Sequence, residues 1–129
     1  MSQETLHGRC PIDFTLSMVG GKWKPLILYR LRAGTLRFGE LQRAIPQVTQ
    51  RMLTLQLREL ERDGLIRRTA YPEVPPRVEY TLTEPTERLM PILEALGEWM
   101  RENEADLQAL RATPPATAEP ADTDDAAKD

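Results

Sequence analysis

Apolar residues recur at helical spacing between residues 51 and 60, and this is the clearest pattern in the chain. Advancing about 100° per residue, as a helix with roughly 3.6 residues per turn requires, places Leu53, Leu57 and Leu60 on one face. The opposite face carries basic and hydrogen-bonding side chains with one leucine: Arg51, Thr54, Leu55 and Arg58. We therefore predict an amphipathic helix with one face for the core and one for solvent or a partner.

The ends of this helix are also marked in the sequence. Thr49 stands where a hydroxyl can accept a hydrogen bond from the first turn, and Gly64 follows Asp63 where a left-handed residue commonly ends a helix. Pro46 ends a shorter predicted helix over residues 39–44, so that residues 45–48 form a turn. A short helix, a turn and a longer helix in this order predict a helix-turn-helix.

Two segments after the long helix have the pattern of antiparallel strands. Residues 65–71 and 77–83 alternate between apolar and polar side chains, and Pro72, Pro75 and Pro76 confine the loop between them. Residues 37–38, before the short helix, are predicted as a small strand or turn. The fold class is therefore mainly α with a small antiparallel β-wing, a winged helix-turn-helix.

Helices are predicted on both sides of this unit. Pro11 suits the first turn of an N-terminal helix that ends at Gly20–Gly21, and a second helix covers residues 24–32. Thr83 is predicted to cap a terminal helix with Pro85 in its first turn and a wide apolar stripe: Leu89, Ile92, Leu93, Leu96, Trp99 and Met100. Such a stripe exceeds what a small core can bury, so we expect a dimer formed by the N- and C-terminal helices. The alternative is a helix that folds back on the first one.

Charge is unevenly distributed along the chain. The 129 residues suit one domain and carry a net charge of −3. Residues 22–88 hold 13 Lys and Arg against 8 Asp and Glu, or +5, whereas residues 113–129 hold 1 against 5, or −4. We predict a flexible arm over residues 1–9, the winged domain with its dimerisation helix over 10–112, and a disordered acidic, Pro/Ala-rich tail over 113–129.

Several function classes find no support in the sequence. One cysteine and one histidine supply no cluster for a metal, and neither a nucleophile–base arrangement nor a phosphate-binding glycine loop is present. We therefore expect no enzyme activity, no metal and no cofactor. No apolar run approaches the roughly 20 residues that cross a bilayer, and the N-terminus lacks a signal peptide. The expected location is the cytoplasm.

The second helix of the predicted helix-turn-helix, which follows Thr49, corresponds to a DNA recognition helix. The first turns of such a helix meet base edges, and here they carry Gln50, Arg51 and Thr54. Gln pairs with adenine and Arg with guanine in bidentate geometry, and Leu55 can lie against a thymine methyl group. The alternative is a solvated face with no reading role. Glu73, in the loop between the strands, would be repelled by DNA. Either the nearby arginines outweigh it or the loop tip stays outside.

Four segments that together span roughly residues 10–100 carry a recognisable pattern: CPIDFTLSMVGGKWKPLILYRL, RFGELQRAIPQVTQRMLTLQLRELERDGLIRR, YPEVPPRVEYTLTE and LMPILEALGEWM. In this combination the chain resembles the HxlR-type transcription regulators, relatives of the MarR group. The chain departs from the usual pattern at Pro85–Thr86, where such regulators commonly have Leu-Gly, and in its acidic tail.

The resemblance implies a homodimer that reads a pseudo-palindromic operator in double-stranded DNA. By position it assigns DNA contacts to the recognition helix, through Thr49, Gln50, Arg51, Thr54 and Arg58, and to the wing, through Arg67, Arg68 and Arg77. Neighbouring residues of a regular strand point to opposite faces, so at most one of Arg67 and Arg68 is expected to meet a given phosphate.

Cys10 is the candidate for a regulatory signal. It precedes a helix N-terminus, whose dipole favours a thiolate, and in relatives a cysteine at this place senses oxidants or electrophiles. The alternative is a small buried apolar side chain. Trp23 and Trp99 are expected to pack in the core; the alternative is that they line a pocket for a small effector.

The function predicted is a sequence-specific DNA-binding transcription regulator, a repressor or autoregulator that responds to an oxidant, an electrophile or a small effector. The alternative is a winged-helix module that binds a protein partner without specific DNA readout.

Overall fold

The predicted order of helices and strands is present in the computed structural model, which describes residues 6 and 8–115. The elements in this part of the chain are α1 (Pro11–Val19), α2 (Lys24–Leu31), β1 (Leu36–Arg37), α3 (Phe38–Ala44), α4 (Gln50–Arg62), β2 (Ile66–Tyr71), β3 (Arg77–Leu82) and α5 (Glu84–Ala112). Two compact units are distinguished, one ending at Glu94 and one beginning at Ala95. The mainly α fold with a small antiparallel sheet is confirmed.

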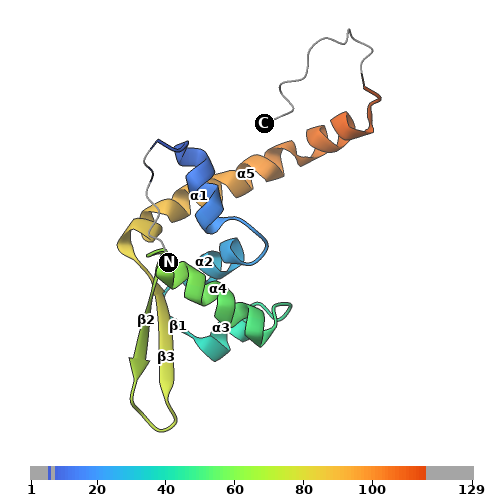
Figure 1. Cartoon of the computed structure of the whole chain (residues 1–129). Coiled ribbons are helices and arrows are strands. Elements are labelled where there is room, and N and C mark those ends of the chain that lie inside the picture. Colours follow the sequence, from blue (N-terminus) through green and yellow to red (C-terminus); the bar gives the residue numbers. More distant parts are fainter. Residues whose placement is uncertain (1–5, 7, 116–129) are drawn as a thin grey trace. The chain divides into compact units, whose positions relative to one another are not determined.

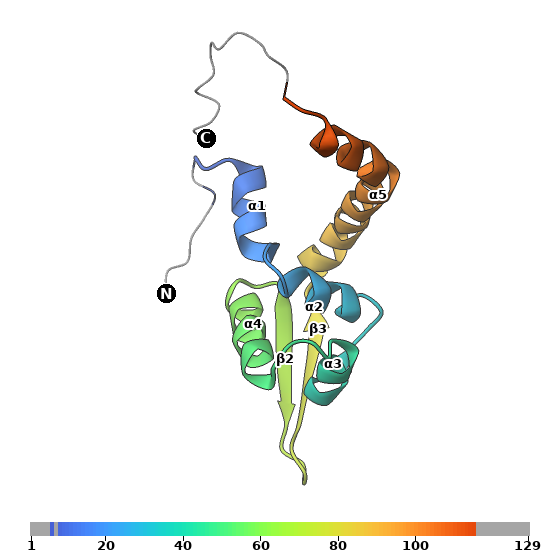
Figure 2. The same cartoon turned by 90° about the vertical axis from the view of Figure 1, so that its right-hand side faces the viewer.

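The sheet is formed by three strands in the order β1-β3-β2, with both pairs antiparallel. In the longer pair Ile66 lies opposite Leu82 and Tyr71 lies opposite Arg77. Residues 72–76 connect β2 to β3, and this loop projects away from α2, α3 and α4 (Figures 1 and 2). The hairpin is the predicted wing, and β1, one residue earlier than the predicted small strand, pairs with Glu79 and Tyr80 in the middle of β3.

The core of the first unit is built around the apolar face of α4. Leu53, Leu57 and Leu60 are buried, as the helical spacing predicted, and belong to one cluster with residues of α2, α3, the turn and the sheet: Ile27, Leu28, Leu31, Leu41, Ile45, Val48, Leu65, Ile66, Tyr80 and Leu82. Burial of a leucine side chain contributes roughly 1.5–3 kcal/mol. The orientation of α4 is therefore set by this face, which leaves its other face free.

Both ends of α4 are capped as the sequence predicts. The Thr49 hydroxyl accepts a hydrogen bond from the Met52 amide at 3.0 Å. At the other end Gly64 has φ of +80°, and the amide of Leu65 donates to the carbonyl of Leu60 at 2.9 Å. A positive φ disfavours side chains other than glycine, and this hydrogen-bond pattern satisfies carbonyls left over at the helix end.

The departure at Pro85–Thr86 has a structural explanation. The Thr83 hydroxyl donates to the Gly64 carbonyl at 2.9 Å and lies 3.0 Å from the hydroxyl of the buried Thr86. The Thr83 carbonyl accepts the Glu87 amide at 2.9 Å, so Thr83 stands at the cap position expected for it. Pro85 fits the first turn because its missing N–H has no partner there. The start of α5 is thus tied to the end of α4.

The second unit contains the remainder of α5, which ends at Ala112. Leu96, Trp99, Met100 and Leu110 of this segment are exposed. No helix within the described residues is long and apolar enough to cross a membrane. The N-terminal arm expected over residues 1–9 and the tail expected over 113–129 lie largely outside the described residues.

The boundaries differ from the expectations by about one residue. α3 begins at Phe38 and not at Gly39, because the Glu40 carboxylate accepts the Arg37 amide at 2.7 Å and so satisfies the preceding backbone N–H. α2 ends at Leu31 and not at Arg32.

Candidate nucleic-acid interface

The turn before α4 fixes where this helix starts. Ile45 and Val48 are buried at either end of the turn, and the Gln42 side-chain amide donates to the Val48 carbonyl at 2.6 Å. Gln42 was not singled out from the sequence, since a glutamine on a short helix has no pattern that reveals a partner six residues later. Its hydrogen bond holds the first residues of α4 in a defined position relative to α3.

The predicted reading residues of α4 lie together on its exposed face. Residues of the first two turns line a single surface depression: Thr49, Gln50, Arg51, Met52, Thr54, Leu55 and Arg58. Leu55 is 45% exposed, whereas Leu57, two positions further on, is 2% exposed. The helix therefore presents five predicted DNA-contact residues and one leucine on the same surface.

These side chains differ in how far the protein already uses them. The Thr49 hydroxyl caps the helix, and the Thr54 hydroxyl donates to the Gln50 carbonyl at 2.9 Å. Arg51 and Arg58 are exposed, and neither forms an ion pair with any residue in the described part of the chain. The guanidinium groups of Arg51 and Arg58 are therefore available to an external acceptor, whereas each threonine hydroxyl already forms one hydrogen bond with the backbone.

A carboxylate on the same helix is compensated from inside the protein. Glu59 forms an ion pair with Lys24 of α2, in which Lys24 Nζ lies 2.7 Å from Glu59 Oε1. The Lys24 side chain is only 12% exposed. This partly buried pair links α2 to α4. It also reduces the negative potential that Glu59 would place beside Arg58.

Arg67 and Arg68 of β2 are both exposed, and within the described residues neither is ion-paired. Arg68 lies opposite Tyr80 and Arg67 opposite Thr81, so the two side chains leave the sheet on different faces. The pair therefore supplies one cation to each face of the wing.

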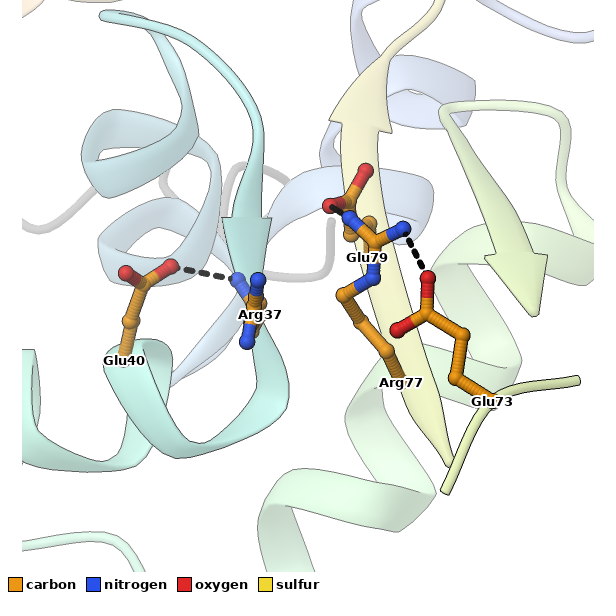
Figure 3. Close-up of polar contacts among 5 residues, drawn as sticks. All are labelled: Arg37, Glu40, Glu73, Arg77 and Glu79. Atoms are coloured by element: carbon orange, nitrogen blue, oxygen red, sulfur yellow. Dashed lines mark hydrogen bonds and ion pairs between the residues drawn. The ribbon is translucent and has the colours of Figure 1, made fainter. Parts of the chain in front are cut away.

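Arg77 has a different environment from the other predicted contacts. Its Nη2 lies 2.7 Å from the Glu73 carboxylate and its Nη1 lies 2.7 Å from the Glu79 carboxylate, as Figure 3 shows. The hydrogen bond to Glu73 and the charges of both carboxylates raise the pKa of Arg77, against the lowering effect of its partial burial. Its guanidinium is thus occupied by partners within the wing.

Cys10 is exposed and stands at the cap position before α1, where its carbonyl accepts the Phe14 amide at 2.9 Å. The alternative of a buried apolar side chain is therefore wrong for this protomer.

Trp23 packs against the core, while Trp99 is 52% exposed on α5. Among the described residues, no group of three or more His, Cys, Asp or Glu side chains is arranged to hold a metal ion.

A helix-turn-helix followed by a β-hairpin defines the winged helix-turn-helix class. The model of the HxlR-like helix-turn-helix family matches residues 18–108, and the chain belongs to this family. The chain is 50% identical over 103 residues to YybR of Bacillus subtilis, which is named an uncharacterized HTH-type transcriptional regulator. The matched region covers 80% of this chain and 82% of that protein.

Solved structures agree with this assignment. The redox regulator HypR in its reduced form is 49% identical, with a TM-score of 0.73 over 78% of this chain and 99% of that chain. The reduced form of the regulator YodB from B. subtilis is 36% identical, with a TM-score of 0.65 over 70% of this chain and 90% of that chain. The protein is a transcriptional regulator of the helix-turn-helix type, a class that is generally not enzymatic.

Proposed function

We propose that this regulator binds a pseudo-palindromic operator in double-stranded DNA as a homodimer and acts as a repressor or autoregulator. The observation that carries the proposal is the exposed face of α4, on which Arg51 and Arg58 lie without ion-pair partners among the described residues. Bidentate contacts from Gln50 and Arg51 to base edges would discriminate by roughly 1–3 kcal/mol each. Thr49, Thr54, Arg58, Arg67 and Arg68 supply further contacts to the duplex.

The homodimer is supported by apolar surface that each unit leaves uncovered. In the first unit Ile12 and Leu16 are exposed on α1, and in the second unit Leu96, Trp99 and Leu110 are exposed on α5. In proteins most of the stability of a helix comes from packing of its apolar face. A second copy of the chain would cover these surfaces and place two recognition helices about 34–36 Å apart, or at a multiple of that distance.

The assembly is tested by sedimentation. The full chain is expected to sediment as a dimer, and the Leu96→Glu/Trp99→Glu variant as a folded monomer with much weaker operator binding. A stable wild-type monomer at micromolar concentration would contradict the dimer.

DNA readout is tested by selecting sites from random duplexes and footprinting the selected sequence. We expect two related half-sites to be protected, with affinity that falls as salt rises by a slope of roughly 0.9 per phosphate contact. A winged-helix module that binds only proteins would select no sequence and protect no half-site, and that result would replace the proposed function by its alternative.

We also propose that Cys10 makes the regulator responsive to an oxidant, an electrophile or a small effector that reacts with the thiol. HypR is described as a redox regulator, which supports this role. Because the chain has one cysteine, a disulfide at Cys10 joins two copies: each thiol loses one hydrogen atom, and the oxidant takes up both. An electrophile would instead form an adduct on one thiol.

The redox role is tested with diamide and a quinone. Operator affinity of the parent is expected to change on treatment and to recover with dithiothreitol after diamide, while the Cys10→Ser protein should not respond. An equal response of the two proteins would remove the sensing role.

A further inference from the structure

The charges near the tip of the wing do not match a simple phosphate-binding surface. Residues 72–76 contain no Lys or Arg, and the one charged side chain among them is Glu73. Arg77 follows at the start of β3, and Glu79 lies two residues further on the same face of the strand. These three groups together carry a net charge of −1. A phosphate placed beside them would meet one cation and two carboxylates.

The guanidinium of Arg77 is fixed from three directions. Nη1 binds Glu79, Nη2 binds Glu73, and the guanidinium carbon lies 3.9 Å from the centre of the Tyr71 ring. Only 23% of the side chain is exposed, and its Nε is buried with no hydrogen-bond partner in the part of the chain that the structure describes. Arg77 is therefore packed into the wing, in contrast to the exposed Arg67 and Arg68 of β2.

These contacts join the two strands to the loop. Tyr71 ends β2 and lies opposite Arg77 in the register of the sheet, while Glu73 belongs to the loop itself. The amide of Glu73 also donates to the carbonyl of Tyr71 at 2.8 Å. Arg77 thus connects the loop, the last residue of β2 and the side chain of Glu79. Figure 3 shows its side chain between the two carboxylates.

We propose that Arg77 is a positioning residue of the wing and not a phosphate contact. It holds residues 72–76 in one conformation and compensates Glu73, so that the loop approaches the duplex without an uncompensated negative charge. Arg67 and Arg68 then supply the phosphate contacts of the wing. This role deepens the proposed DNA binding and rests on it.

The test is the salt dependence of operator affinity for Arg77→Ala, with the Arg67→Ala/Arg68→Ala variant as a matched control on the same hairpin. Arg77→Ala should weaken binding roughly three- to tenfold at every salt concentration. Without Arg77 the loop is no longer held in one conformation before binding, and ordering it on binding costs free energy. The slope of log K against log salt should stay that of the wild type. The control should lose roughly 0.9 of slope for each phosphate contact removed.

Two further variants separate positioning from charge. Arg77→Lys keeps the charge but cannot bridge two carboxylates with a planar fork, so it should bind as weakly as Arg77→Ala. Glu73→Ala should weaken binding even though it removes a negative charge from the wing. Hydrogen exchange of the free protein should be faster at the amides of Tyr71, Glu73 and Val74 in both Ala variants, and unchanged in α4.

A fall in slope of about one for Arg77→Ala, with full affinity retained by Arg77→Lys, would show a phosphate contact and overturn the positioning role. Tighter binding by Glu73→Ala, or unchanged exchange in the loop, would also overturn it. If the wild type itself shows no salt-dependent binding to the selected duplex, the proposed DNA-binding function fails and not merely the role of Arg77.

Discussion

The exposed face of α4 and the tip of the wing use arginine in opposite ways. On α4, Arg51 and Arg58 point to solvent and are not ion-paired within the described residues. In the wing, Arg77 is enclosed by Glu73, Glu79 and the Tyr71 ring. One region keeps its cations available to a partner, and the other uses its cation to maintain its own shape.

This difference shows why a count of basic residues overestimates a DNA-binding surface. The +5 balance of residues 22–88 includes Lys24 and Arg77, which are paired at 2.7 Å with carboxylates of the same protomer. Phosphates are neutralised by Lys and Arg side chains that displace the counterions bound to the DNA. The contacts of this regulator are therefore to be sought among its unpaired arginines.

The largest expected change is in stability, and it should differ between the buried and the exposed face of α4. Leu57→Ala removes a buried side chain and should lower the free energy of unfolding by about 2–5 kcal/mol. Leu55→Ala, on the exposed face, should change it by less than about 0.5 kcal/mol. Urea denaturation of both variants measures this contrast. Equal losses would show that the exposed face is packed against protein.

Arg51→Ala should have the next largest effect, on specificity. Loss of one bidentate base contact costs roughly 1–3 kcal/mol, or about 5- to 150-fold in affinity for the selected operator. Fluorescence anisotropy with the operator and a scrambled duplex checks this, and Arg88→Ala on α5 serves as a charge-matched control. Equal weakening on both duplexes would assign Arg51 to phosphate contact instead of base reading.

Thr49→Ala tests the cap that positions the start of α4. Loss of the hydrogen bond to the Met52 amide should lower the free energy of unfolding by about 1 kcal/mol. Thr49→Ser keeps the hydroxyl and should restore most of this loss, as measured by thermal or urea denaturation. If Thr49→Ala is as stable as the parent, the cap does not contribute to the helix.

The smallest expected effect concerns Leu55. If this exposed leucine lies against a thymine methyl group, replacing that thymine by uracil should weaken binding roughly threefold to fourfold, since one buried carbon is worth about 0.8 kcal/mol. The Leu55→Ala protein should bind both operators equally. A uracil effect that survives in Leu55→Ala would place the methyl contact elsewhere.

Features of the fold that depend on the spacing of neighbouring residues could be predicted from the sequence. The leucines of α4, its cap at Thr49 and its end at Gly64 were all predicted, because periodicity and capping are properties of neighbouring residues. The partners of Arg77 and Lys24 were not predicted. The Lys24–Glu59 pair joins residues far apart in the chain, and the Arg77 cluster depends on how the loop at 72–76 returns into the sheet.

Base reading by the exposed face of α4 can be measured by parallel selection from random duplexes with the wild type and Arg51→Ala. We expect the wild type to enrich two related half-sites and Arg51→Ala to lose the preference at one base position in each. Identical enriched sequences, or none with either protein, would contradict base reading by this face.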